Sequence, residues 1–244
     1  MMEAGFDCGY PKRHTTFCTG TDQLVFLIEN TLYGVPRTLL LQSTIFSSML
    51  DMIDMGGSLE GRSDDHPITL GGITTFEMDN FLTLLYAHNL GAKLSFTIAQ
   101  WSAALHLSTM WVFDSLRTYA IAEISSYHPN QCPFDRIDLA MRCQVAQWLF
   151  PSYESICTRW EPLTTEEMMR LGFERLTAIA RIREAICRSS GKDKTKTALH
   201  MIKEAKELEI PFSDGSPIKV PTPPMEQMTV TAFPDTDSDS DSDW

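Results

Sequence analysis

The stretch Leu24-Val25-Phe26-Leu27-Ile28-Glu29-Asn30-Thr31-Leu32-Tyr33-Gly34-Val35-Pro36 decides what kind of fold this chain can adopt. Residues 24–28 and 31–35 are short apolar runs rich in β-branched and aromatic side chains, and a polar pair separates them. Two such runs joined by a short polar break predict a β-hairpin. Pro36 lacks a backbone N–H, so the second strand should end there.

The residues that follow the hairpin have helical spacing. Ser43 is placed to cap a helix that carries Ile45, Phe46, Met49 and Leu50 along one side. Glycines and polar residues come next and predict a loop.

A third short strand is expected at residues 68–70, and beyond it only helices. Thr74-Thr75-Phe76-Glu77 and Thr164-Thr165-Glu166-Glu167 are capping boxes that predict two helix starts. A bend is expected at Gly172. Apolar side chains at three- and four-residue steps mark the helices; their inward residues are Phe81, Leu82 and Leu85, then Ile98, Trp101 and Leu105, then Phe113, Leu116, Ala120 and Ile124, then Ile137, Ala140 and Cys143, then Trp148, Leu149, Tyr153 and Ile156, then Leu176, Ile179, Ile182 and Ile186, and finally Ala198, Ile202, Ala205 and Leu208.

These elements predict an α+β protein with four regions. Residues 1–20 lack periodicity and are expected to form a flexible arm. Residues 21–127 form a domain with a short three-stranded sheet and helices, and residues 128–210 form an all-helical extension. Residues 211–244 are rich in proline and then alternate aspartate with hydroxyl residues, so this tail is predicted to be disordered.

The charge of the chain argues against several classes of partner. Lys and Arg total 20 against 32 Asp and Glu, which gives a formal net charge of −12. Direct binding to nucleic acid or to an anionic membrane needs clustered cations, and we expect neither. Half of the net charge lies in residues 211–244. Ser238, Ser240 and Ser242 lie among these aspartates and are candidate phosphorylation sites; the alternative is a charge run that only keeps the chain in solution.

No catalytic, metal or cofactor site is expected. Cys8, His14 and Cys18 lie close together in the sequence, but a tetrahedral zinc needs a fourth ligand and none stands at the usual spacing. The six histidines form no pair at helical spacing, and no motif for nucleophilic catalysis or phosphate binding is present. The sequence therefore predicts a protein that is not an enzyme.

The location of the protein is predicted from what the sequence lacks. The six cysteines are widely spaced and include no Cys-x-x-Cys pair, which favours free thiols in a reducing compartment. The first residues carry acids where a signal peptide carries cations, and no apolar run is long enough to span a membrane. We expect a soluble protein of the cytoplasm, the nucleus or both.

Several segments in the same order resemble the BTB/POZ domain. The hairpin residues 25–33 are similar to its opening strands, residues 35–50 to its first two helices, and residues 67–86 to its third strand and third helix. Trp148-Leu149-x-Pro151-x-Tyr153-Glu154 and the residues after it up to Gly172 resemble a basidiomycete-type BTB subfamily with a helical C-terminal extension. The resemblance covers about residues 20–190.

This resemblance implies a protein that works by binding proteins. In the family two copies commonly pair through the N-terminal segment and the first helices, which makes the chain a candidate homodimer; the candidate contact residues are Leu39, Leu40, Ile45, Phe46 and Met49, of which about half should face inward. Phe46→Asp is then expected to yield a monomer.

The resemblance also implies a role as a scaffold or adaptor. One candidate partner is a cullin-type ubiquitin ligase, bound through the region of Phe76, Glu77 and Asn80. The alternative is a transcriptional regulator that reaches DNA only through protein partners.

Two positions depart from the family pattern. Many members carry Asp at the start of the first strand, where this chain has Gln23, and His before the basic residue of the first helix, where it has Pro36. Arg37 is therefore expected to lack its partner, which argues against co-repressor capture through the family's charged pocket.

Overall fold

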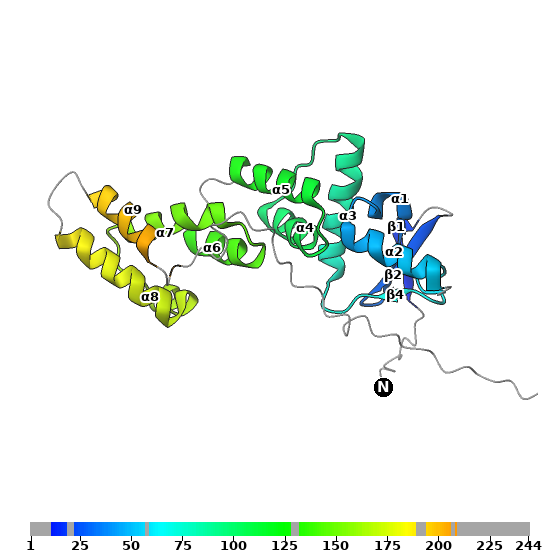
Figure 1. Ribbon diagram of the computed structural model, residues 1–244, viewed down its shortest axis with the longest axis horizontal. Coiled ribbons are helices and arrows are strands. Elements are labelled where there is room, and N and C mark those ends of the chain that lie inside the picture. Colours follow the sequence, from blue (N-terminus) through cyan, green and yellow to red (C-terminus); the bar gives the residue numbers. More distant parts are fainter. Residues whose placement is uncertain are drawn as a thin grey trace, which may run out of the picture. The chain divides into compact units, whose positions relative to one another are not determined.

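The computed structural model describes residues 11–18, 22–56, 59–127, 132–188, 194–205 and 208. They form an α+β protein with a small mixed sheet and many helices (Figure 1). The residues fall into two compact units, one reaching to Thr75 and the other starting at Phe76. This division lies inside residues 21–127, which the sequence analysis treats as one domain.

The first unit contains the sheet and two helices. Its elements are β1 (Lys12–Cys18), β2 (Gln23–Ile28), β3 (Thr31–Pro36), α1 (Arg37–Leu40), α2 (Thr44–Gly56) and β4 (Ile68–Thr69). The strand order is β1-β3-β2-β4, with β2 antiparallel to β3, and with β1 and β4 parallel to their neighbours. The predicted hairpin and the predicted third short strand are thus confirmed.

The hairpin β2–β3 is the buried centre of this sheet. Consecutive side chains of both strands are buried, so neither face of the hairpin is left to solvent. The turn places Glu29 at φ 54°, a left-handed conformation that tight two-residue turns require. Phe46 from α2 packs edge-on against Phe26 of β2, with ring centroids 5.8 Å apart.

Strand β1 corrects two predictions. Residues 12–18 were expected to belong to a flexible arm, but they pair in parallel with β3, and the sheet has four strands where three were predicted. His14 of β1 stacks on the Tyr33 ring of β3 at a centroid distance of 4.9 Å.

The second unit is helical. Its elements are α3 (Thr75–Leu90, whose first residue belongs to the first unit), α4 (Ile98–Met110), α5 (Asp114–Tyr127), α6 (Pro133–Arg142), the 3-10 turn η1 (Ala146–Trp148), α7 (Leu149–Thr158), α8 (Thr165–Arg188) and α9 (Lys194–Glu204). Helix α4 packs on α5, α6 packs on α7, and α7 also packs on α8 and α9. The predicted inward residues from Trp101 to Ile156 are buried, which confirms these helices.

Two contacts join α5 to the helical extension. The Arg117 guanidinium donates to the carbonyl oxygens of Cys143 and Gln144 at the end of α6, over 3.2 and 2.9 Å. The indole Nε1 of Trp148 donates to the Ser125 hydroxyl at 2.9 Å. The two Arg117 bonds satisfy carbonyl groups that the end of α6 leaves without a partner inside the helix.

Helix α8 begins and bends as the sequence predicts. The Thr164 hydroxyl accepts from the backbone N–H of Glu167 at 3.2 Å, and the Glu167 carboxylate accepts from the backbone N–H of Thr164 at 2.9 Å. This is the expected capping box. Gly172 has φ 72° and ψ 166°, a conformation open mainly to glycine, and it divides α8 into two helical segments.

Candidate functional site

The predicted self-association residues divide between the core and the surface of the first unit. Leu40 and Phe46 are both only 2 % exposed. These two side chains are held in the core of the chain itself and offer no surface to a partner. Leu39, Ile45 and Met49 are half-buried, so they remain as candidate contact residues.

Helix α2 carries apolar side chains on two neighbouring sides. Phe46, Leu50 and Ile53 face the core. Ile45, Met49 and Met52 follow one another at steps of four and three residues and form a second row, which we name the α2 stripe. Met52 is 57 % exposed, although it belongs to the same helix as the core residues.

Further apolar side chains lie next to the α2 stripe in the sequence. Leu41 precedes the helix and is 55 % exposed, and Met55 near its end is 91 % exposed. The sequence analysis missed Leu41, Met52 and Met55, although the spacing of the methionines was a usable signal. Exposed large apolar side chains of this kind are candidates for contact with another molecule.

Arg37 has acidic partners, which corrects the expectation that it lacks one. Its guanidinium donates to both carboxylate oxygens of Asp54 on α2, each at 2.8 Å, and lies 4.0 Å from Asp22. Arg62 is 3.6 Å from the same Asp54 carboxylate. The Arg37–Asp54 pair ties α1 to α2. Their exposure makes their contribution to stability small.

The three residues predicted to contact a cullin differ in their surroundings. Phe76 is 50 % exposed at the start of α3. The Glu77 carboxylate lies 2.9 Å from Nδ1 of His106 on α4. Asn80 is buried and donates to the backbone carbonyl of Phe76 at 2.7 Å. Of the three, Phe76 has the apolar side chain that a partner can reach.

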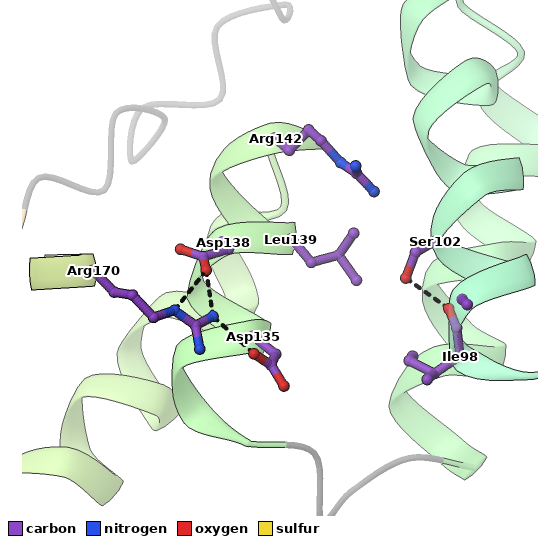
Figure 2. A pocket seen from close by; sticks show the side chains of 8 residues that line it. Ile98, Ser102, Asp135, Asp138, Leu139, Arg142 and Arg170 are labelled. Atoms are coloured by element: carbon purple, nitrogen blue, oxygen red, sulfur yellow. Dashed lines mark hydrogen bonds and ion pairs between the residues drawn. The ribbon is translucent and has the colours of Figure 1, made fainter. Parts of the chain in front are cut away.

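The second unit holds an open pocket of about 320 Å³ between α4 and α6 (Figure 2). Arg170 lies at its edge, 2.7 Å from the Asp135 carboxylate and hydrogen-bonded to Asp138, and these bonds raise the pKa of the arginine. Ser102 donates to the Ile98 carbonyl at 2.7 Å. Within the pocket, Arg170 thus bonds to both aspartates, and the Ser102 hydroxyl bonds to a carbonyl of its own helix.

The described thiols and histidines form no metal site either. Among the described residues no group of three metal-binding side chains is close enough to hold an ion. Nδ1 of His14 accepts from the backbone N–H groups of Thr16 and Phe17, at 3.2 and 3.1 Å. Burial raises the pKa of Cys143 and of Cys157 to about 11, so both remain protonated at neutral pH. Cys8 and the serines Ser238, Ser240 and Ser242 lie outside the described residues, as does the predicted tail.

Comparisons with known proteins give the chain no family. No protein-family model matches the sequence, and no curated protein matches it either. None of the helices in the described part of the chain combines the length and the apolar character needed to cross a bilayer.

Proposed function

We propose that this chain is a BTB/POZ-type protein interaction module without enzymatic activity and that two copies associate through the α2 stripe. The observation that carries the proposal is the apolar row of half-buried Ile45 and Met49 and exposed Met52, which lies beside the core-facing side of the same helix. A helix that needed only to cover its own core would carry polar residues in that row. A second copy offers the same apolar row in return, as a two-fold symmetric contact requires.

The association supplies the means by which such a module acts as a scaffold or adaptor. Pairing two chains doubles every other binding surface that each chain carries, which raises the apparent affinity for a partner with two sites. The half-exposed Phe76 supports the proposal of a cullin contact at the start of α3. Binding of a purified cullin N-terminal region by the wild-type chain, and its loss in Phe76→Gln, test that part separately.

The two buried thiols form no disulfide bond, which is compatible with a reducing compartment. Cys143 and Cys157 are free and lie in the helical core. The proposal therefore includes the cytoplasm or the nucleus as the place of action.

Met52→Lys tests the self-association. Full burial of a methionine side chain contributes about 1.5–3 kcal/mol. Because Met52 is 57 % exposed in the single chain, its burial in the dimer would contribute about 1–1.5 kcal/mol for each copy. Because the contact is symmetric, the variant removes this free energy from both copies, which raises the dimer dissociation constant about 30- to 150-fold. Sedimentation equilibrium measures this constant.

Leu90→Lys is the control, because Leu90 is 81 % exposed on α3 in the second unit. It introduces the same side chain far from the α2 stripe in the sequence. The proposal predicts an unchanged dimer for this variant. A wild-type chain that is monomeric throughout, or a Met52→Lys dimer as tight as the wild type, contradicts the proposed self-association.

A further inference from the structure

All methionines in the described part of the first unit lie on α2. They are Met49, Met52 and Met55, which follow one another at three-residue steps. The buried apolar residues described for this unit are leucines, isoleucines, valines and aromatic residues, and no methionine is among them. The first unit thus keeps its thioether groups out of its core and gathers them on one helix.

This distribution matters because a thioether is oxidised easily at its sulfur, whereas the aliphatic side chains of the core are not. We propose that the methionines of α2 make the association of two copies sensitive to oxidation. A hydroperoxide converts them into sulfoxides, and the modified chains no longer pair through the α2 stripe. The inference rests on the proposed self-association and names how that association is regulated.

The chemical step needs only the thioether and the oxidant. The sulfur lone pair attacks the hydroxyl oxygen of the hydroperoxide and forms the S–O bond while the O–O bond breaks. The sulfur loses two electrons, and the hydroxyl proton moves to the departing oxygen, so hydrogen peroxide is reduced to water. A methionine sulfoxide reductase reverses the change with two thiols, which become a disulfide while the sulfoxide oxygen leaves as water.

The oxidant reaches these sulfur atoms without unfolding of the chain. Met55 is 91 % exposed and Met52 57 %, and Met49 is half-buried. Residues three apart are neighbours on a helix surface, so Met52 lies beside both other methionines. Met49 and Met52 belong to the α2 stripe and are covered when two copies pair. Oxidation and association therefore compete for the same side chains.

Oxidation places a hydrogen-bond acceptor inside an apolar contact. The second copy presents the same apolar row, which has no hydrogen-bond donor to offer. Ser48, four residues before Met52, already donates its hydroxyl hydrogen to the Thr44 carbonyl at 3.0 Å. A sulfoxide buried in this contact loses its hydrogen bonds to water and gains none in return, which favours the separated chains.

The fold of the first unit should not suffer from the same change. The core-facing side of α2 carries Phe46, Leu50 and Ile53, and none of these side chains contains sulfur. In the separated chain, Met52 and Met55 are in contact with water before and after oxidation. The modification therefore acts on the association and leaves the stability of the single chain largely unchanged.

The test uses the full chain treated with hydrogen peroxide and then with dithiothreitol, which reduces disulfides but not sulfoxides. Peptide mass mapping identifies the modified methionines, and the dose is kept below that at which Met78, only 1 % exposed, reacts. Sedimentation equilibrium should show a dimer dissociation constant at least about 30-fold higher after treatment, because Met49 and Met52 lose apolar contact in both copies. Sulfoxide reductases should restore the original constant.

Protection by association gives a second readout. Well above the dissociation constant of the untreated dimer, Met52 should react several-fold more slowly than in dilute protein. Met169 on α8 is 72 % exposed and lies outside the α2 stripe, so its rate should be the same at both concentrations.

The key variant is Met49→Leu/Met52→Leu/Met55→Leu. It keeps apolar side chains of similar volume in the row and removes the thioethers. It should form a dimer with a dissociation constant within about 3-fold of the wild type, and peroxide should not change this constant. Met169→Leu makes the same substitution in the second unit and should remain as sensitive to peroxide as the wild type.

Three results overturn the proposal. Equal weakening of the triple leucine variant and the wild type by peroxide assigns the effect to other groups. A wild-type dimer that keeps its dissociation constant, although mass mapping finds Met52 fully oxidised, shows that the modification does not control the contact. A wild-type chain that is monomeric before any oxidant is added refutes the self-association itself, so this failure is recognised from the untreated sample alone.

Discussion

Phe46→Ala tests whether Phe46 belongs to the core of the first unit or to a surface that contacts a partner. The Phe46 side chain is 2 % exposed, and its ring packs edge-on against Phe26 at 5.8 Å. The sequence analysis placed this residue in the contact between copies. Shortening Phe46 should therefore destabilise the fold of each chain and should not act primarily on the proposed contact between copies.

The expected loss follows from the burial of the ring. Replacing a fully buried phenylalanine by alanine costs about 3–5 kcal/mol, because the apolar transfer energy is lost and a cavity remains. The edge-on contact with Phe26 accounts for about 0.5–1.5 kcal/mol of such a loss. With a urea dependence of about 2 kcal/mol per M, the unfolding midpoint should fall by about 2 M. Met52→Ala, at an exposed position, should change the stability by about 0.5 kcal/mol or less at a protein concentration too low for the proposed dimer to form.

Urea unfolding followed by far-UV circular dichroism at two protein concentrations measures this effect. A loss of core stability persists at low concentration, whereas a loss of dimer contacts fades as the wild type itself dissociates. The reasoning is refuted if Phe46→Ala leaves the midpoint at low concentration unchanged and converts a dimer into a monomer. Phe46 would then contact a partner.

Three further perturbations have outcomes that the structure determines. Hydrogen bonding by Arg159 lowers the pKa of Glu167 in the folded protein. The pair therefore stabilises the fold above the unfolded pKa of about 4.3, and this stabilisation is lost as the pH falls through the folded pKa. Glu167→Gln should flatten the acid side of the curve of stability against pH, and an unchanged slope would disprove the coupling. Iodoacetamide at neutral pH should modify the exposed Cys187 but not the buried Cys157, as peptide mass mapping of the native protein will show. Gly172→Ala should destabilise the protein by about 1–3 kcal/mol in chemical denaturation through backbone strain alone, since the added methyl group meets no atom within 4 Å; a stabilised variant would contradict the assigned conformation.

Local patterns were sufficient to predict the elements whose stabilising contacts lie close in sequence. The β2–β3 hairpin depends on two apolar runs and a turn within fourteen residues, and both strands were predicted within one or two residues of their bounds. The start of α8 depends on Thr164 and Glu167, three residues apart, and the capping box was predicted correctly. Such contacts can be read from spacing alone.

Elements that depend on distant partners could not be predicted in this way. Strand β1 has few apolar residues, and its pairing with β3 is parallel, so nothing in residues 12–18 alone identifies it as a strand. Arg37 was expected to lack a partner because Gln23 stands where many family members carry Asp; its observed partner, Asp54, lies seventeen positions further along on another helix. The exposed state of Met52 and the burial of Phe46 also depend on which side of α2 meets the sheet, and periodicity does not give this direction.

The parallel pairing of β1 with β3 has a practical consequence for anyone who shortens this chain. A cut before residue 21, where the sequence suggests that the domain begins, would remove β1 and uncover the backbone N–H and C=O groups of β3 that now bond to it. A newly bare sheet edge invites strands of other molecules to add to it. Truncated protein of this kind should precipitate or exchange strands on storage, and keeping residues 11–18 should prevent this.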